Sequence, residues 1–125
     1  MKEKNELKKL TIQLLSLVNT VAEKFEDVKK TGKAGDFYTE VKPFADKVKH
    51  INDQWRIVAL NWIETRKPKN MHVAQIDSTY DQIEAIAVQA FFPETSRTRF
   101  TNIVTSIKYI LNNIIALVSK EEREP

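Results

Sequence analysis

Apolar residues in this chain recur at alternating spacings of three and four, and this period constrains the fold more than any other feature. The stripe between residues 37 and 62 keeps the alternation throughout, and it consists of Phe37, Val41, Phe44, Val48, Ile51, Trp55, Val58 and Trp62. Such a spacing averages 3.5 residues per turn, which is the period of helices wound into a left-handed supercoil. The pattern therefore predicts long helices that pack together along their apolar stripes.

Three further segments show helical periodicity. The first covers about residues 3–30, and its stripe is Leu7, Leu10, Leu14, Leu17, Val21, Phe25 and Val28. The third begins near His72, with the stripe Val73, Ile76, Tyr80, Ile83, Ala87 and Ala90. The fourth begins at Ser96, with Phe100, Ile103, Ile107, Ile110, Ile114 and Leu117. Short connections make neighbouring helices antiparallel, so the sequence predicts an all-α fold, a left-handed up-down-up-down four-helix bundle forming a single domain over residues 1–125.

The composition narrows the class of protein. Two glycines and four prolines provide too few turns for a β-sandwich or barrel, and the absence of cysteine excludes disulfides and thiolate metal sites. The formal net charge of +3 is too small to indicate a nucleic-acid ligand by itself. The first ten residues lack the apolar core of a secretory signal, and no apolar run approaches the ~20 residues of a membrane span. We therefore expect a cytoplasmic protein that does not bind membranes.

The predicted topology gathers basic and aromatic residues at one end of the bundle. The loops that follow the first and third helices meet there, and the basic residues at this end are Lys29, Lys30, Lys33, Arg97 and Arg99. Phe92 precedes Pro93 in the same region, at a helix end. Aromatic rings among cations are typical of surfaces that bind an acidic partner or single-stranded nucleic acid. These six residues form the candidate interaction surface, while most other rings at this end are expected to close the core.

No pattern in the sequence indicates a metal site or a catalytic centre. Metal sites in helical bundles use Glu-x-x-His pairs, but lysine stands three residues before each histidine, Lys47 before His50 and Lys69 before His72. Three carboxylates share one face of the third segment, and we expect a solvated acidic face that can form salt bridges to a neighbouring helix: Asp77, Asp81 and Glu84. We accordingly expect no cofactor.

The junction between the second and third segments carries the most specific motif. It reads Arg66-Lys67-Pro68-Lys69-Asn70-Met71-His72 and continues to Gln75-Ile76. With Val41-Lys42-Pro43 upstream, and Arg99-Phe100 and Ser106-Ile107-Lys108-Tyr109-Ile110-Leu111 downstream, it resembles the YppE-like family of small bacterial proteins of unassigned function. The resemblance covers residues 36–111 well and implies a left-handed four-helix bundle. It implies no activity, cofactor or catalytic residue.

Arg66 and His72 also permit a comparison with nucleases. Their Arg-x5-His spacing is similar to the ribonuclease motif of the HEPN superfamily, in which both residues act on RNA. In this chain Pro68 stiffens the segment and biases Lys67 toward extended geometry. We therefore expect local structural roles, with Arg66 near the free carbonyls of one helix and the His72 side chain capping the next. The motif residues with no assigned function are Arg66, Pro68, Lys69, His72 and Gln75.

The sequence thus favours a small cytosolic protein-interaction or adaptor module without catalytic activity. Its partner is expected to be another protein, of unknown identity, and nucleic acid is disfavoured. The alternative is an RNA-binding or RNA-cleaving bundle that uses the Arg-x5-His motif. Because the four stripes can satisfy one another within one chain, we expect a monomer or a weak dimer.

Overall fold

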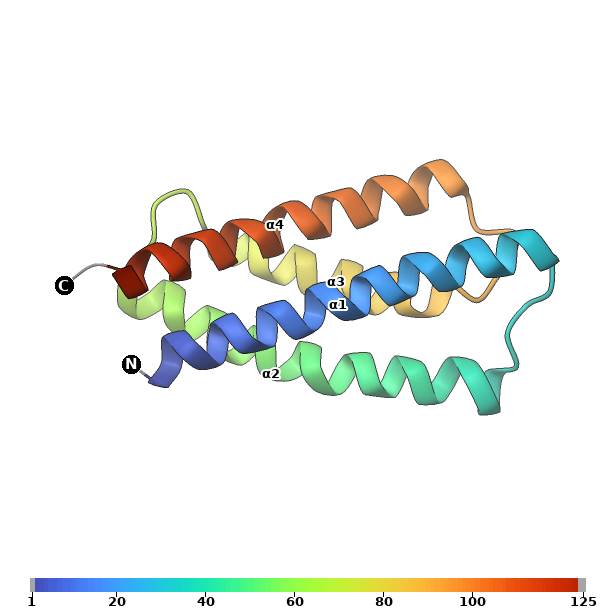
Figure 1. Ribbon diagram of the computed structural model, residues 1–125, viewed down its shortest axis with the longest axis horizontal. Coiled ribbons are helices and arrows are strands. Elements are labelled where there is room, and N and C mark those ends of the chain that lie inside the picture. The colour runs from blue at the N-terminus through green and yellow to red at the C-terminus, as the bar shows by residue number, and fades with distance from the viewer. Residues whose placement is uncertain (1, 124–125) are drawn as a thin grey trace.

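Four antiparallel helices form the molecule (Figure 1). The computed structural model describes residues 2–123, and its helices are α1 (Lys2–Thr31), α2 (Lys42–Arg66), α3 (Val73–Gln89) and α4 (Arg97–Arg123). A π-helical turn, η1 (Phe37–Val41), precedes α2. The α1–α2 and α3–α4 loops share one end of the bundle, and the α2–α3 loop lies at the other end. The predicted all-α, up-down-up-down four-helix bundle is confirmed; residues 1, 124 and 125 of the expected domain lie outside the described residues.

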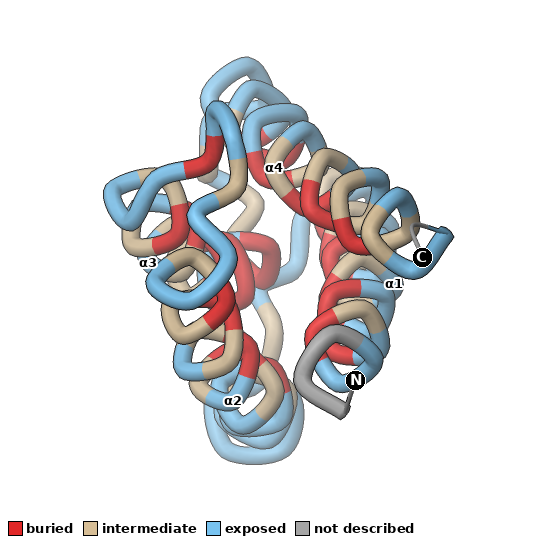
Figure 2. The backbone as a smooth tube through the Cα atoms, turned by 90° about the vertical axis from the view of Figure 1, so that its left-hand side faces the viewer, coloured by how far each residue is buried: buried red, intermediate tan, exposed pale blue. Residues whose placement is uncertain are grey.

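Buried residues follow a heptad spacing of four and three, and they lie on the inner sides of the helices (Figure 2). In α1 these residues are Leu7, Thr11, Leu14, Val18, Val21, Phe25 and Val28, and Leu10 beside Thr11 is buried as well. In α2 they include Val48, Asn52, Trp55, Ala59 and Trp62, and in α4 they are Phe100, Val104, Ile107, Leu111, Ile114 and Val118. This spacing is the one that packs helices into left-handed supercoils, as the sequence predicts.

Some of the predicted stripe positions are wrong. Val18 takes the buried place expected for Leu17, which is half-buried. The reason is that polar residues occupy heptad positions, Thr11 in α1 and Asn52 in α2, so an apolar-only pattern drifts onto their neighbours. In α4, Ile103, Ile110 and Leu117 only flank the core, because each stands beside a second apolar residue that is buried instead. Phe37 and Val73 are half-exposed, because they lie at helix beginnings rather than along a packed face.

Polar groups inside the core bond across the helices. The Trp55 indole N–H donates to the Thr11 hydroxyl at 3.1 Å, and this hydroxyl donates to the Leu7 carbonyl at 2.7 Å. The Asn52 amide nitrogen donates to the Tyr80 carbonyl at 3.0 Å, while its buried amide oxygen has no partner among the described residues. These bonds satisfy most of the polar atoms that the core encloses, as burial requires.

The helix ends follow the punctuation of the sequence. Gly32 ends α1 in a left-handed conformation with φ of 69°, Pro43 lies in the first turn of α2, and Ser96 caps α4. Helix α2 continues through Arg66, and α3 ends at Gln89, three residues before Phe92. The turn at residues 90–92 is held by backbone hydrogen bonds from Phe91 and Phe92 to α3 carbonyls.

Helix α4 is long and apolar enough to cross a membrane by length and composition alone, with a mean hydropathy of 1.2 over 18 residues. The sequence expectation of no spanning segment was based on the length of uninterrupted apolar runs. Helix α4 meets the criterion of length and mean hydropathy because the residues between its apolar positions are mostly uncharged. Its large apolar side chains Phe100, Ile107, Leu111 and Ile114 are buried in the bundle core. A core helix passes the same criterion, so it does not assign α4 to a membrane.

Candidate functional site

The bundle end that carries the predicted interaction surface is closed by aromatic rings. The Phe25 and Phe100 rings stack with their centroids 4.0 Å apart, and the Phe91 ring meets the Phe44 ring edge-on at 5.8 Å. The Gly35 N–H donates to the Phe91 carbonyl at 2.9 Å, and a Cβ at Gly35 would lie 2.6 Å from the Phe91 ring. The two loops therefore fit closely, and the rings buried here belong to the core as the sequence predicts.

Two residues of the candidate surface bind within the molecule. Lys29 donates to the Pro93 carbonyl at 2.8 Å, and Arg97 pairs with both carboxylate oxygens of Glu26 at 2.5 Å. The hydrogen bond from Arg97 holds the pKa of the Glu26 carboxyl below its usual value. Both cations also lie over the Phe25 ring. Lys29 and Arg97 therefore fasten α1 to the α3–α4 loop and the start of α4, which commits them to internal contacts.

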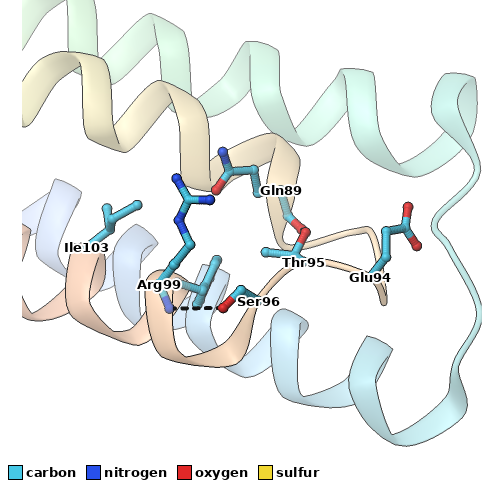
Figure 3. A pocket seen from close by; sticks show the side chains of 7 residues that line it. Gln89, Glu94, Thr95, Ser96, Arg99 and Ile103 are labelled. Atoms are coloured by element: carbon cyan, nitrogen blue, oxygen red, sulfur yellow. Dashed lines mark hydrogen bonds between the residues drawn. The ribbon is translucent and has the colours of Figure 1, made fainter.

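Arg99 and Phe92 lie apart from these contacts. Arg99 lines a cleft of about 380 Å³ between the end of α3 and the start of α4, and it points across the cleft toward Gln89 (Figure 3). Glu94 lies at the edge of the cleft. Phe92 is half-buried rather than exposed. The structure thus separates the six predicted residues, and only Lys30, Lys33 and Arg99 keep exposed cationic groups outside the ion pairs formed among the described residues.

Two exposed aromatic residues, Phe37 and Tyr38, lie at the same end of the bundle. The sequence pattern placed Phe37 on the buried stripe of the second segment and gave no position for Tyr38. Phe37 is 54% exposed and Tyr38 is 78% exposed, and their rings meet edge-on at 5.1 Å on η1. Asp36 caps this turn by accepting from the Thr39 N–H and hydroxyl, both at 2.9 Å. We call Phe37 and Tyr38 the aromatic tip. Successive residues of a helix do not share a face, so the Phe-Tyr pair itself indicated that at least one ring lies outside the core.

The Arg-x5-His motif spans the opposite end of the bundle. The Arg66 guanidinium lies 3.8 Å from the Glu121 carboxylate of α4, which also accepts from the Trp62 indole at 3.1 Å. Arg66 thus contacts a carboxylate rather than the expected free carbonyls. Lys67 is left-handed with φ of 46° and caps α2 through its N–H, so the extended geometry predicted for it is wrong. A residue in this conformation ends many helices, with proline following it.

His72 occupies the N-cap position of α3, as predicted, and forms a capping box with Gln75. In this box the Gln75 amide oxygen accepts from the His72 backbone N–H at 2.7 Å. His72 is exposed to solvent. Gln75, which had no assigned role in the sequence, thus contributes a side-chain hydrogen bond to the start of α3.

The α2–α3 seam holds a network of charged and phenolic groups, and two of the three carboxylates of the predicted acidic face, Asp77 and Glu84, form salt bridges in it. The Tyr80 hydroxyl donates to the Asp53 carboxylate, and the Lys49 ammonium lies 3.3 Å from that hydroxyl and 3.7 Å from the Glu84 carboxylate. Asp77 pairs with Arg56 at 2.8 Å. The hydrogen bond to Asp53 raises the pKa of Tyr80 and lowers that of Asp53. The hydrogen bond between the phenol and the carboxylate joins α2 to α3.

The chain matches known proteins over nearly its whole length. Residues 11–118 match a bacterial domain of unknown function, DUF1798. The chain is 24% identical over 116 residues to the uncharacterised protein YppE of Bacillus subtilis. This alignment covers 93% of the chain and 94% of YppE. A crystal structure of a protein of unknown function from Listeria innocua has a TM-score of 0.93 at 27% identity and 98% coverage of both chains. A crystal structure of a DUF1798 domain from Staphylococcus aureus has a TM-score of 0.85 at 28% identity, over 91% of this chain and 96% of that chain.

Proposed function

The chain belongs to the DUF1798 family of bacterial domains of unknown function, and we propose that it is a non-catalytic protein-interaction module of the cytoplasm. Its aromatic tip is proposed to bind an acidic segment of a partner protein. The observation that carries this proposal is the exposure of the Phe37–Tyr38 pair. Tyr38 has the largest exposed fraction, 78%, among the large hydrophobic residues that the structure describes.

The chemistry of the tip supports a protein partner. Large aromatic side chains have few rotatable bonds, so they lose little conformational entropy on binding, and they dominate the energetics of many interfaces. The tip stands on a π-helical turn, a rare conformation that is frequent at functional sites. Asp36 and Thr39 hold this turn through two hydrogen bonds, so the rings are presented on an ordered backbone.

The charges near the tip favour an acidic segment. Lys30 and Lys33 lie within seven residues of Phe37 in the chain, both are exposed, and neither forms an ion pair within residues 5–123. Unpaired cations beside an aromatic anchor speed association with an acidic partner and help to select it. The predicted interaction surface is thereby revised: the proposed surface keeps Lys30 and Lys33 and replaces Phe92 with the aromatic tip.

The surroundings of the Arg-x5-His motif support the non-catalytic half of the proposal. A nuclease needs its arginine free to stabilise charge on a phosphodiester, whereas Arg66 faces the Glu121 carboxylate. The His72 residue is placed by the Gln75 cap at the start of α3. Both residues thus have structural contacts that need no substrate.

The proposal is tested by capture of a partner from cells of the native bacterium. The wild type is expected to retain a protein, identified by mass spectrometry, through an acidic segment that binds more weakly as salt rises. The Phe37→Ser, Tyr38→Ser double variant should lose this protein, while Ile57→Ser, which alters a residue that is 69% exposed on α2, should retain it. Capture that survives the double variant would assign the interaction to another face.

A second measurement addresses catalysis. Neither the wild type nor His72→Ala is expected to cleave single-stranded RNA. Cleavage by the wild type that disappears in His72→Ala, at unchanged stability, would contradict the non-catalytic proposal and favour the ribonuclease alternative.

A further inference from the structure

The middle of α4 carries almost no charge on its solvent-facing side. Between residues 100 and 119 the only charged residue is Lys108, although 30% of the whole chain is charged. The exposed residues in this stretch are Thr101, Asn102, Thr105, Ser106, Tyr109, Asn112 and Ala116. Lys108 lies three helical turns beyond Arg97, on the side of α4 that faces α1. Between residues 100 and 119, the outer face of α4 is thus an uncharged surface of hydroxyl, amide and aromatic groups.

A groove continues this uncharged face onto α3. It has a volume of about 290 Å³ and lies between the two helices, with Ala74, Ser78 and Gln82 on the α3 side and Ser106 and Ile110 on the α4 side. Two charged residues of this part of α3 pair with α2 instead, as the Asp77–Arg56 and Glu84–Lys49 contacts show, while Asp81 is exposed to solvent. Short side chains such as Ala74 and Ser78 leave the groove open to a larger group.

Tyr109 stands beside this groove. Its side chain is 65% exposed, and its neighbours in the helix, Ser106 one turn before it and Ile110 directly after it, line the groove. The same face therefore presents both a projecting aromatic ring and a shallow groove beside it. A surface that carries a projection and a groove can pair with itself, with each feature used twice.

We propose that this face binds a second copy of the chain. In the proposed dimer, the Tyr109 ring of each subunit enters the α3–α4 groove of its partner about a two-fold axis. Identical charges close to a two-fold axis would face each other, which opposes pairing. The uncharged face avoids this repulsion, and an antiparallel arrangement of the two α4 helices also opposes their dipoles.

The chemistry of the face favours a second copy over other occupants. An acidic or basic partner would be expected to meet opposite charges, which this face lacks. A membrane-bound helix combines lysine and arginine on one side with large apolar residues on the other, whereas the exposed residues here are mostly hydroxyls and amides. Since one helix and one groove from each subunit form a small contact, and interfaces below about 1,200 Å² are weak, the dimer should form only at high concentration.

Sedimentation velocity from micromolar to millimolar concentration tests the proposal. The wild type should shift from monomer to dimer as its concentration rises. Tyr109→Glu and Ser78→Glu, one for the projection and one for the groove, should each raise the dimer dissociation constant by at least about tenfold. The matched control Ile57→Glu introduces the same charge at a residue that is 69% exposed on α2, and it should leave the dissociation constant unchanged. Circular dichroism melting confirms that each variant is folded.

The absence of cysteine allows a direct measurement of the contact. One chain carrying Ser78→Cys is mixed with another carrying Tyr109→Cys under mild oxidation, and the disulfide between the two different chains should form faster than either homodimer. The proposal is overturned by a wild type that stays monomeric at millimolar concentration, by a dimer that tolerates Tyr109→Glu and Ser78→Glu, or by a dimer that Ile57→Glu abolishes. Binding of phosphatidylcholine vesicles that requires Tyr109 would instead assign the face to a membrane surface.

Discussion

At the residue scale, the buried hydrogen bond from Trp55 to Thr11 links α2 to α1 inside the core. Thr11→Val keeps the shape of the side chain but removes the acceptor, which leaves the indole N–H without a partner. We expect a loss of about 1–3 kcal/mol in the free energy of unfolding, the cost of an unsatisfied buried donor. Urea denaturation measures it. Thr11→Ser keeps the oxygen and should lose less; equal losses would show that the methyl group, rather than the hydrogen bond, matters.

Gln75 and His72 give a second prediction at this scale, because the Gln75 side chain contributes a hydrogen bond to the start of α3. Gln75→Ala should lower the free energy of unfolding by about 0.3–1.5 kcal/mol, which is typical of a helix-capping group. His72→Ala should change it by less than about 0.5 kcal/mol, as substitutions of exposed side chains do. Thermal unfolding of both variants checks the order, and a larger loss for His72→Ala would assign the capping role to the imidazole.

At the scale of elements, the α2–α3 seam makes stability depend on pH. The hydrogen bonds from Tyr80 and Lys49 hold the pKa of the Asp53 carboxyl below its ordinary value of 3.8. A carboxyl whose pKa is lower in the folded state stabilises the fold above its unfolded pKa, and this contribution is lost as the pH falls through the folded pKa. We therefore expect the free energy of unfolding to decline below about pH 4. Urea denaturation at a series of pH values measures this decline.

Asp53→Asn should make the acid decline less steep, because the amide accepts the Tyr80 hydrogen bond without titrating. The decline should not vanish, since the pKa values of Glu26 and Asp36 are also lowered, by Arg97 and by the Thr39 hydrogen bonds respectively. Asp81→Asn on the exposed side of α3 serves as the control and should follow the wild type. An Asp53→Asn profile that coincides with the wild type would show that the seam does not couple folding to protonation.

The elements also show how far the sequence can be interpreted. The alternating spacing of three and four predicted the helices because a helix that buries one face needs apolar residues at that spacing. The prediction holds even where one core position is polar. The positions of Thr11 and Asn52 could not be predicted, since a polar residue in the core is recognised only when its partner from another helix is known. The aromatic tip could not be predicted from the spacing either. Phe37 continues the apolar spacing of α2, but it lies in the π-helical turn that precedes this helix.

At the scale of the whole molecule, topology predicted the end at which the candidate surface lies but not which of its residues are free. Lys29 and Arg97 were grouped with Lys30 and Lys33 because all four lie near the two loops. Their internal partners, the Pro93 carbonyl and Glu26, lie more than 60 positions away in the chain. Pairing at that separation depends on how the helices pack, so a charge pattern along the sequence cannot distinguish a structural cation from an available one.

The cooperativity of the whole bundle provides the last prediction. Each helix contributes to one continuous core cluster, and both tryptophans, Trp55 and Trp62, report on α2 within it. Since no part of the described chain has a separate core, the helices should lose their packing together, as single domains of this size do. Unfolding in urea followed by tryptophan fluorescence, which reports α2, and by circular dichroism, which reports all four helices, should give coincident transitions. If the fluorescence transition came first, α2 would unfold while other helices persist, and the expectation of a single cooperative domain would be wrong.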